Sequence, residues 1–137
     1  MRGISKKTRK DLEFDTVLDQ LAGRCMTETG KKAVGHIGPI TNKDQLLKVL
    51  RQTSEYVSSF TNENRIPNHR FDSIKSELRT LQIENAVLQI AGFRRIAALC
   101  ETVRIQKKFF KKFKEYYPLL FQHAETVEAN KTIHPAI

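Results

Sequence analysis

The chain has 137 residues, with 24 Lys or Arg against 15 Asp or Glu, so its formal charge is +9. Hydrophobic residues make up 39% of the chain and charged residues 28%, which is typical of one soluble folded domain and excludes a disordered or collagen-like polymer. No apolar stretch approaches the roughly 20 residues that cross a bilayer, and the acidic residues that follow the basic N-terminus do not fit a signal peptide. We therefore expect a cytoplasmic protein that has no contact with a membrane.

The first ten residues are predicted to form a basic N-terminal arm, because residues 2–10 contain five bases and no acid. Residues 14–25 then carry apolar side chains at steps of three and four, which predicts an amphipathic helix with acids at its start. Thr27 is a suitable N-cap for a second helix that ends near Ile37, before Gly38 and Pro39. A third helix is predicted over 41–60, with leucines at near-heptad spacing.

The second half of the chain begins with a loop, which is predicted over residues 61–70 from its asparagines and Pro67. A short helix is expected over 71–81, and a long helix of about 28 residues from Asn85 to Phe113. Pro118 marks a break, and a last helix follows from Leu119 to about Ala129. No period-two pattern predicts a strand. The expected fold is an all-α helical bundle in which one long helix extends beyond the core.

Positive charge is concentrated in two segments, because residues 104–114 hold six bases and no acid, like the N-terminal arm. Outside these two segments the remaining bases are slightly outnumbered by acids. Such patches favour phosphate backbones through counterion release, although a solvated helix face has the same composition. The candidate nucleic-acid contacts are Lys6, Lys7, Arg9, Lys10, Lys107, Lys108, Lys111, Lys112 and Lys114.

Aromatic residues interleave with the second basic segment, and two interpretations are open. The first is a base-stacking platform flanked by phosphate-binding lysines. The second is an amphipathic helix whose core stripe includes Phe110 and Phe113, with the lysine stems lying along it. Under the second interpretation, Phe109, Tyr116 and Tyr117 remain candidate exposed anchors for another protein segment.

Catalytic and cofactor motifs are not evident. The segment from Gly23 to Lys32 fails as a P-loop, because six residues separate its glycines and no Ser or Thr follows Lys31. The histidines are scattered, and His69 in the loop is the least implausible catalytic candidate, although no nucleophile stands beside it. Cys25 and Cys100 lack metal-ligand spacing and are expected to be reduced core thiols. We assign no catalytic, cofactor-binding or metal residue.

The order of several spaced motifs carries a family resemblance. Leu12, Glu13 and Phe14 are followed by Leu18, Leu21 and Ala22, and then by Thr27, Gly30 and Lys31. Further matching segments lie at residues 37–46, 64–69, 71–74 and 109–120. Together these resemble the opening of the MutS-two branch of the MutS ATPases, in its Bacteroidetes-type form.

The resemblance implies a role within a larger protein of DNA mismatch repair or recombination. Residues 11–137 would form the helical core, or lever, domain that couples a distant ATPase domain to a nucleic-acid clamp, and the chain itself would not be an enzyme. The whole protein would be a homodimer that uses ATP and magnesium, acts on branched or duplex DNA or on ribosomes, and in some members carries an endonuclease domain. The isolated chain is expected to be a monomer. The alternative is a free-standing basic helical module that binds nucleic acid or another protein.

Overall fold

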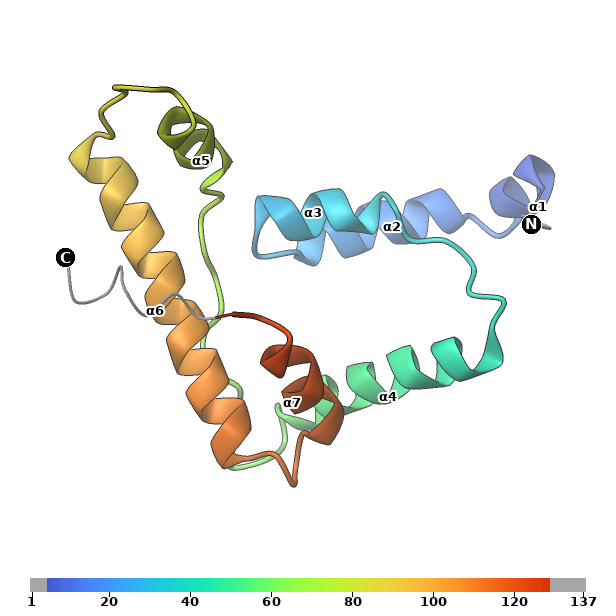
Figure 1. Ribbon diagram of the computed structural model, residues 1–137. Coiled ribbons are helices and arrows are strands. Elements are labelled where there is room, and N and C mark those ends of the chain that lie inside the picture. The colour runs from blue at the N-terminus through green and yellow to red at the C-terminus, as the bar shows by residue number, and fades with distance from the viewer. Residues whose placement is uncertain (1–4, 129–137) are drawn as a thin grey trace. The chain divides into compact units, whose positions relative to one another are not determined.

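The computed structural model describes residues 5–128, and its regular structure there is entirely helical, with seven α-helices and no strand (Figure 1). The expected all-α fold is confirmed. The chain divides into two compact units, Met1–Asn42 and Lys43–Ile137. The boundary between these units separates two sets of residues that each pack compactly. The predicted division after residue 10 instead separated a basic arm from a lever domain by their expected roles, and it stays a prediction.

The first unit is built from α1 (Lys6–Asp11), α2 (Phe14–Arg24) and α3 (Glu28–Val34). Thr27 caps α3 as predicted, because its hydroxyl oxygen accepts a hydrogen bond from the Gly30 backbone N–H at 3.0 Å. α2 and α3 pack together, and Leu18 and Val34 are the buried apolar side chains of this pair. Burial of these side chains helps to hold two short helices that would be marginal alone.

Helix α1 was not expected, since the basic segment has too few apolar residues to produce a helical stripe. Ser5 begins the helix by accepting a hydrogen bond from the Thr8 N–H at 3.0 Å. Arg9 then ties α1 to α2, because its guanidinium binds the Asp15 carboxylate and lies 5.2 Å from the centre of the Phe14 ring. Local capping and one surface ion pair therefore hold residues 6–11 in a helix.

The second unit contains α4 (Lys43–Ser58), α5 (Lys75–Leu81), α6 (Ile90–Lys112) and α7 (Pro118–Glu125). α7 packs against both α4 and α6, so it joins the two longest helices of this unit (Figure 1). The buried apolar side chains are Ile96 and Phe110 on α6, together with Tyr117 immediately before α7. The core of this unit thus lies along α6 and at the start of α7.

The segment between α4 and α5 has no helix, yet hydrogen bonds hold it at Asn64 and Pro67. It runs beside α6 (Figure 1), where the Gln106 side-chain amide donates to the backbone oxygen of Pro67 at 2.9 Å. The Tyr117 hydroxyl donates to the backbone oxygen of Asn64 at 2.6 Å. These side chains satisfy carbonyl groups that have no helical or strand partner.

Several predicted boundaries were wrong. The long helix begins at Ile90 and has 23 residues, because Asn85 takes a left-handed backbone conformation with φ 61° and interrupts the predicted first turn. α5 begins at Lys75, after the predicted start. The last helix begins at Pro118 itself, whose missing N–H is harmless in a first turn. Cys25 and Cys100 are free but only partly buried, so they are not core thiols.

Candidate nucleic-acid interface

The candidate lysines near the end of α6 lie mainly on one face of that helix. At about 100° per residue, Lys108, Lys111 and Lys112 fall within roughly one third of the circumference, opposite the buried Phe110. All three are exposed, as is Lys114 just beyond the helix, and none of these four forms an ion pair with residues 5–128. The structure therefore brings four of the five predicted residues to an open, uncompensated basic surface. We call Lys108, Lys111, Lys112 and Lys114 the α6 lysine surface.

Lys107 behaves differently from its neighbours. Its ammonium donates to the backbone oxygen of Val127 at 2.5 Å, which fastens the end of α6 to the segment after α7. Arg104, one turn earlier, forms a bidentate pair with Glu101, and this pairing raises the pKa of Arg104 above its ordinary value. These two cations are therefore engaged within the chain, and the carbonyl end of the α6 dipole further favours the positive charge that gathers there.

The aromatic residues between 109 and 117 are sorted by the fold into core and surface. Tyr117 is 0% exposed, so its prediction as a surface anchor was wrong. Its ring packs near Phe109 and Phe110, with ring centres 5.8 and 6.2 Å away. Phe109 and Phe113 are half-buried in the same cluster, with centres 4.8 Å apart. Tyr116 is 60% exposed and touches the cluster only at its edge, through Phe113.

The N-terminal candidates belong to the other compact unit. Lys6, Lys7 and Lys10 are exposed on α1, whereas Arg9 is held by Asp15. The hydrogen bond to that carboxylate raises the pKa of Arg9 further above its ordinary value. Three of the four predicted bases of this segment are therefore open to an anionic partner, and the fourth maintains the helix that carries them.

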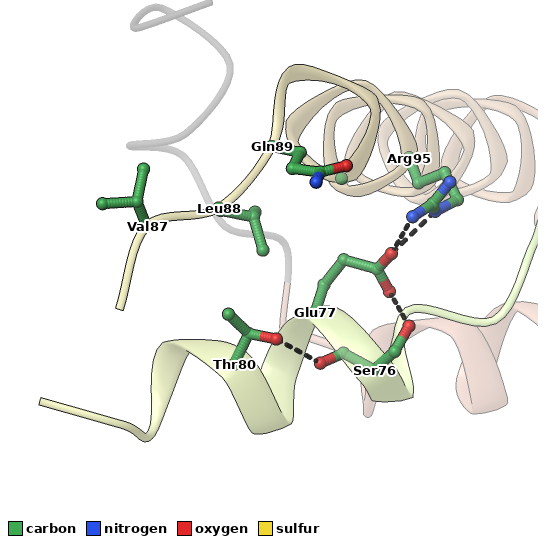
Figure 2. Close-up of a pocket in the computed structure, with 8 residues that line it drawn as sticks. Ser76, Glu77, Thr80, Val87, Leu88, Gln89 and Arg95 are labelled. Carbon is green, nitrogen blue, oxygen red and sulfur yellow. Dashed lines mark hydrogen bonds and ion pairs between the residues drawn. The ribbon is translucent and has the colours of Figure 1, made fainter. Parts of the chain in front are cut away.

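A polar pocket of about 320 Å³ lies between α5 and the start of α6 (Figure 2). Its central side chain is Glu77, which is only 3% exposed. The Arg95 Nε–H donates to one Glu77 oxygen at 2.7 Å, and the Ser76 hydroxyl donates to the other at 2.8 Å. Gly92 completes the contact, because a Cβ there would lie 3.0 Å from a Leu88 side-chain carbon and 3.2 Å from Glu77 Cγ.

The Glu77 carboxylate is stabilised in its charged form. The Arg95 hydrogen bond is the largest cause of a lowered pKa for Glu77, and the hydrogen bonds from Ser76 and from its own backbone N–H act in the same direction. Burial opposes this effect without reversing it. The partners of this buried carboxylate come from its own helix, through Ser76, and from α6, through Arg95. It is therefore a joint between α5 and α6 and offers no poised acid or base.

His69 does not acquire a catalytic setting. Its Nδ1 lies 3.2 Å from the backbone oxygen of Pro67, and its Nε2 lies 3.4 Å from the Tyr56 hydroxyl, whose ring packs edge-on against the imidazole. These contacts give His69 a structural role within the loop between α4 and α5. Within residues 5–128, no group of His, Cys, Asp and Glu side chains could hold a metal ion.

Three polar anchors were missed at the level of sequence: Glu55, Glu77 and Gln106. Glu55 on α4 accepts hydrogen bonds from the backbone N–H groups of Leu119 and Leu120, at 2.9 to 3.1 Å, and so caps α7 from a distant helix. Gln106 occupies the one polar position in the apolar stripe of α6, but its partners in the loop could not be read from spacing. A single polar residue on an apolar stripe, such as Gln106, is the sequence signal that could have indicated a polar anchor.

Within residues 5–128, these observations define a helical structure with an open basic surface, polar anchors that hold helices and a loop together, and no group of side chains that could hold a metal ion. The sequence is similar to proteins called Endonuclease MutS2. It is 28% identical to the one from Pelotomaculum thermopropionicum over 87% of this chain, and 24% identical to the one from Lacticaseibacillus casei over 98%. The protein from Bacillus velezensis is 26% identical over 89% of this chain. The chain is therefore related to one region of MutS2.

The matched region is short within those proteins, since this chain spans 15%, 17% and 16% of their respective lengths. No protein-family model matches the chain, and no solved structure matches it. None of the helices within residues 5–128 is both long and apolar enough to cross a membrane.

Proposed function

We propose that this chain is a non-catalytic helical core or lever segment of a MutS-like ATPase, and that it transmits changes between a distant ATPase domain and a nucleic-acid clamp. The observation that carries the proposal is the similarity of nearly the whole chain to a single region of MutS2 proteins. The sequence carries no P-loop motif, and no group of side chains in residues 5–128 could hold a metal ion. A mechanical role in the larger protein is consistent with both observations.

The contacts of the second unit support a mechanical role. α6 has 23 residues and is therefore about 35 Å long, a stiff element that can carry a displacement over that distance. α7 is bound to α4 by the Glu55 cap and packs on α6, so a shift of α4 is transmitted to α6 through α7. Gln106 and Tyr117 fasten the intervening loop to the same joint.

The finer features of the whole protein belong to the same proposal. They are the use of ATP and magnesium, homodimerisation, an endonuclease domain, a cytoplasmic location, and action on branched DNA, mismatches or ribosomes. The assignment to a Bacteroidetes-type form is likewise a proposal, which the loop motifs around Asn64 and Phe71 support.

The lever proposal is tested by transplantation. The region of Lacticaseibacillus casei MutS2 that matches this chain is replaced by the chain, and ATP hydrolysis is measured with and without DNA. We expect the chimera to keep a DNA-dependent change in hydrolysis, whereas deletion of the region abolishes that change. A deletion protein with the same DNA dependence as the intact enzyme would contradict the proposal.

A second function is favoured by one specific observation, the α6 lysine surface with its four uncompensated cations. We propose that this surface binds nucleic acid directly. Changing Lys108, Lys111 and Lys112 to Glu is expected to abolish DNA binding by the isolated chain, with its circular dichroism unchanged. Retained binding by this folded variant would refute the second function.

A further inference from the structure

One exposed aromatic ring stands beside the α6 lysine surface. Of the five aromatic residues between 109 and 117, Tyr117 and Phe110 are buried and Phe109 and Phe113 are half-buried, which leaves Tyr116 at 60% exposure. The other four rings make close contacts with one another, whereas Tyr116 has one ring contact, to Phe113, with centres 6.4 Å apart. The cluster therefore supports the Tyr116 ring without covering it.

A cation lies over Phe113, the ring that Tyr116 contacts. The Lys112 ammonium is 5.0 Å from the centre of the Phe113 ring, on which Tyr116 leans. Lys108 lies one turn of the helix before Lys111 and Lys112, and side chains three and four residues apart are neighbours about 5–6 Å apart. Lys114 lies beyond the helix, two residues before Tyr116 in the sequence. An accessible aromatic ring is thus placed at one end of a short row of positive charges.

From this arrangement we propose that Tyr116 and the α6 lysine surface bind single-stranded nucleic acid, with one base stacked on the Tyr116 ring and the adjoining phosphates on the lysines. Stacking on an aromatic side chain combined with a basic track is how single strands are held without sequence preference. Bases in a duplex are already stacked on each other and cannot reach the ring. The inference rests on the second function above, and it specifies the form of nucleic acid.

The experiment titrates the full chain into fluorescent oligothymidine, oligouridine and a duplex of equal length, at low and moderate salt, and follows anisotropy. We expect both single strands to bind more tightly than the duplex, with a log–log salt slope of about −3 for four lysines. Tyr116→Ala is expected to weaken single-strand binding by about 5-fold to 100-fold, whereas Tyr116→Phe leaves it unchanged.

Matched variants separate the ring from the charge. Lys48→Gln with Lys75→Gln removes two exposed lysines from α4 and α5, and it is expected to bind like the unmodified chain. The stacking proposal is overturned, and the basic surface stands, if the variant with Lys108, Lys111 and Lys112 changed to Glu loses binding while Tyr116→Ala binds like the unmodified chain. The same conclusion follows if the duplex binds as tightly as the single strands. If no nucleic acid binds at low salt, both are overturned. A preference for uridine or thymidine identifies RNA or DNA as the better partner.

Discussion

Replacing Glu55 with alanine should destabilise the second unit by removing the cap of α7. The helix begins at Pro118, and the side chain of Tyr117, its N-cap residue, accepts no hydrogen bond from the first turn of the helix. The first-turn N–H groups of Leu119 and Leu120 instead donate to the Glu55 carboxylate, at 2.9 to 3.1 Å. Without Glu55 these two donors have no protein partner in the first turn of the helix.

The size of the effect follows from this geometry. Loss of an N-cap costs about 0.5–2 kcal/mol, and hydrogen bonds to a charged group are worth about 1.5–3 kcal/mol. Because Glu55 is half-buried and accepts from two N–H groups, we expect Glu55→Ala to lower the free energy of unfolding by about 2 kcal/mol. The corresponding fall in Tm is roughly 10 °C for a unit of this size.

Thermal unfolding followed by circular dichroism measures the loss. Glu55→Gln, which keeps an acceptor oxygen and loses the charge, should lie between the unmodified chain and Glu55→Ala. Glu63→Ala is the matched control, because Glu63 is an exposed acid in the loop that follows α4 and its change should cost less than about 0.5 kcal/mol. Equal stability of Glu55→Ala and Glu63→Ala would refute the capping argument.

Three further predictions concern the buried Tyr117, the buried Glu77 and the glycines Gly92 and Gly23. Tyr117→Phe should cost about 1–2 kcal/mol in urea unfolding, because it leaves the Asn64 backbone oxygen without its donor. Because the pKa of Glu77 is lowered in the folded chain, its contribution to the free energy of unfolding is complete above the ordinary glutamate pKa of 4.5 and is lost as pH falls through the folded-state pKa. Glu77→Gln should therefore flatten the dependence of the urea midpoint on acid pH. Gly92→Ala should destabilise, because its Cβ meets side chains at 3.0 and 3.2 Å, whereas Gly23→Ala, with nothing within 4 Å, should stabilise by about 0.5–1 kcal/mol.

Each of these predictions has a result that would contradict it. Tyr116→Phe is the control for Tyr117→Phe. An equal loss of unfolding free energy in both variants would mean that the hydrogen bond from Tyr117 to Asn64 does not stabilise the fold. An acid dependence that survives in Glu77→Gln would assign it to other carboxylates. If Gly92→Ala gains as much stability as Gly23→Ala, the contact between α5 and α6 is looser than the structure describes.

Helix positions were predictable where apolar spacing and a local cap coincided. α2 and α3 were found in this way, since the stripe of α2 and the Thr27 cap are both local signals. α1 was missed because a capped basic turn has no apolar stripe. The start of α6 was missed because a left-handed residue such as Asn85 has no strong signature in a polar stretch.

The sorting of Tyr116 from Tyr117 shows what limited the prediction of the site. Tyr117 lies four residues after Phe113 and seven after Phe110, so it continues the core stripe, but the break before Pro118 obscured that periodicity. The lysines were identified from charge alone, and the structure separates the tethered Lys107 from the open ones. Pairs such as Glu77 with Arg95 connect different helices, and no local pattern predicts such contacts.

The measurement that tests the lever role most directly is the DNA-dependent change in ATP hydrolysis by the MutS2 chimera that carries Glu55→Ala, compared with the chimera that carries Glu63→Ala. The account predicts that loosening α7 from α4 reduces this change while hydrolysis without DNA stays the same, and that the Glu63 variant couples like the unmodified chimera. Equal DNA dependence in the two variants would contradict transmission through the α4, α7 and α6 joint.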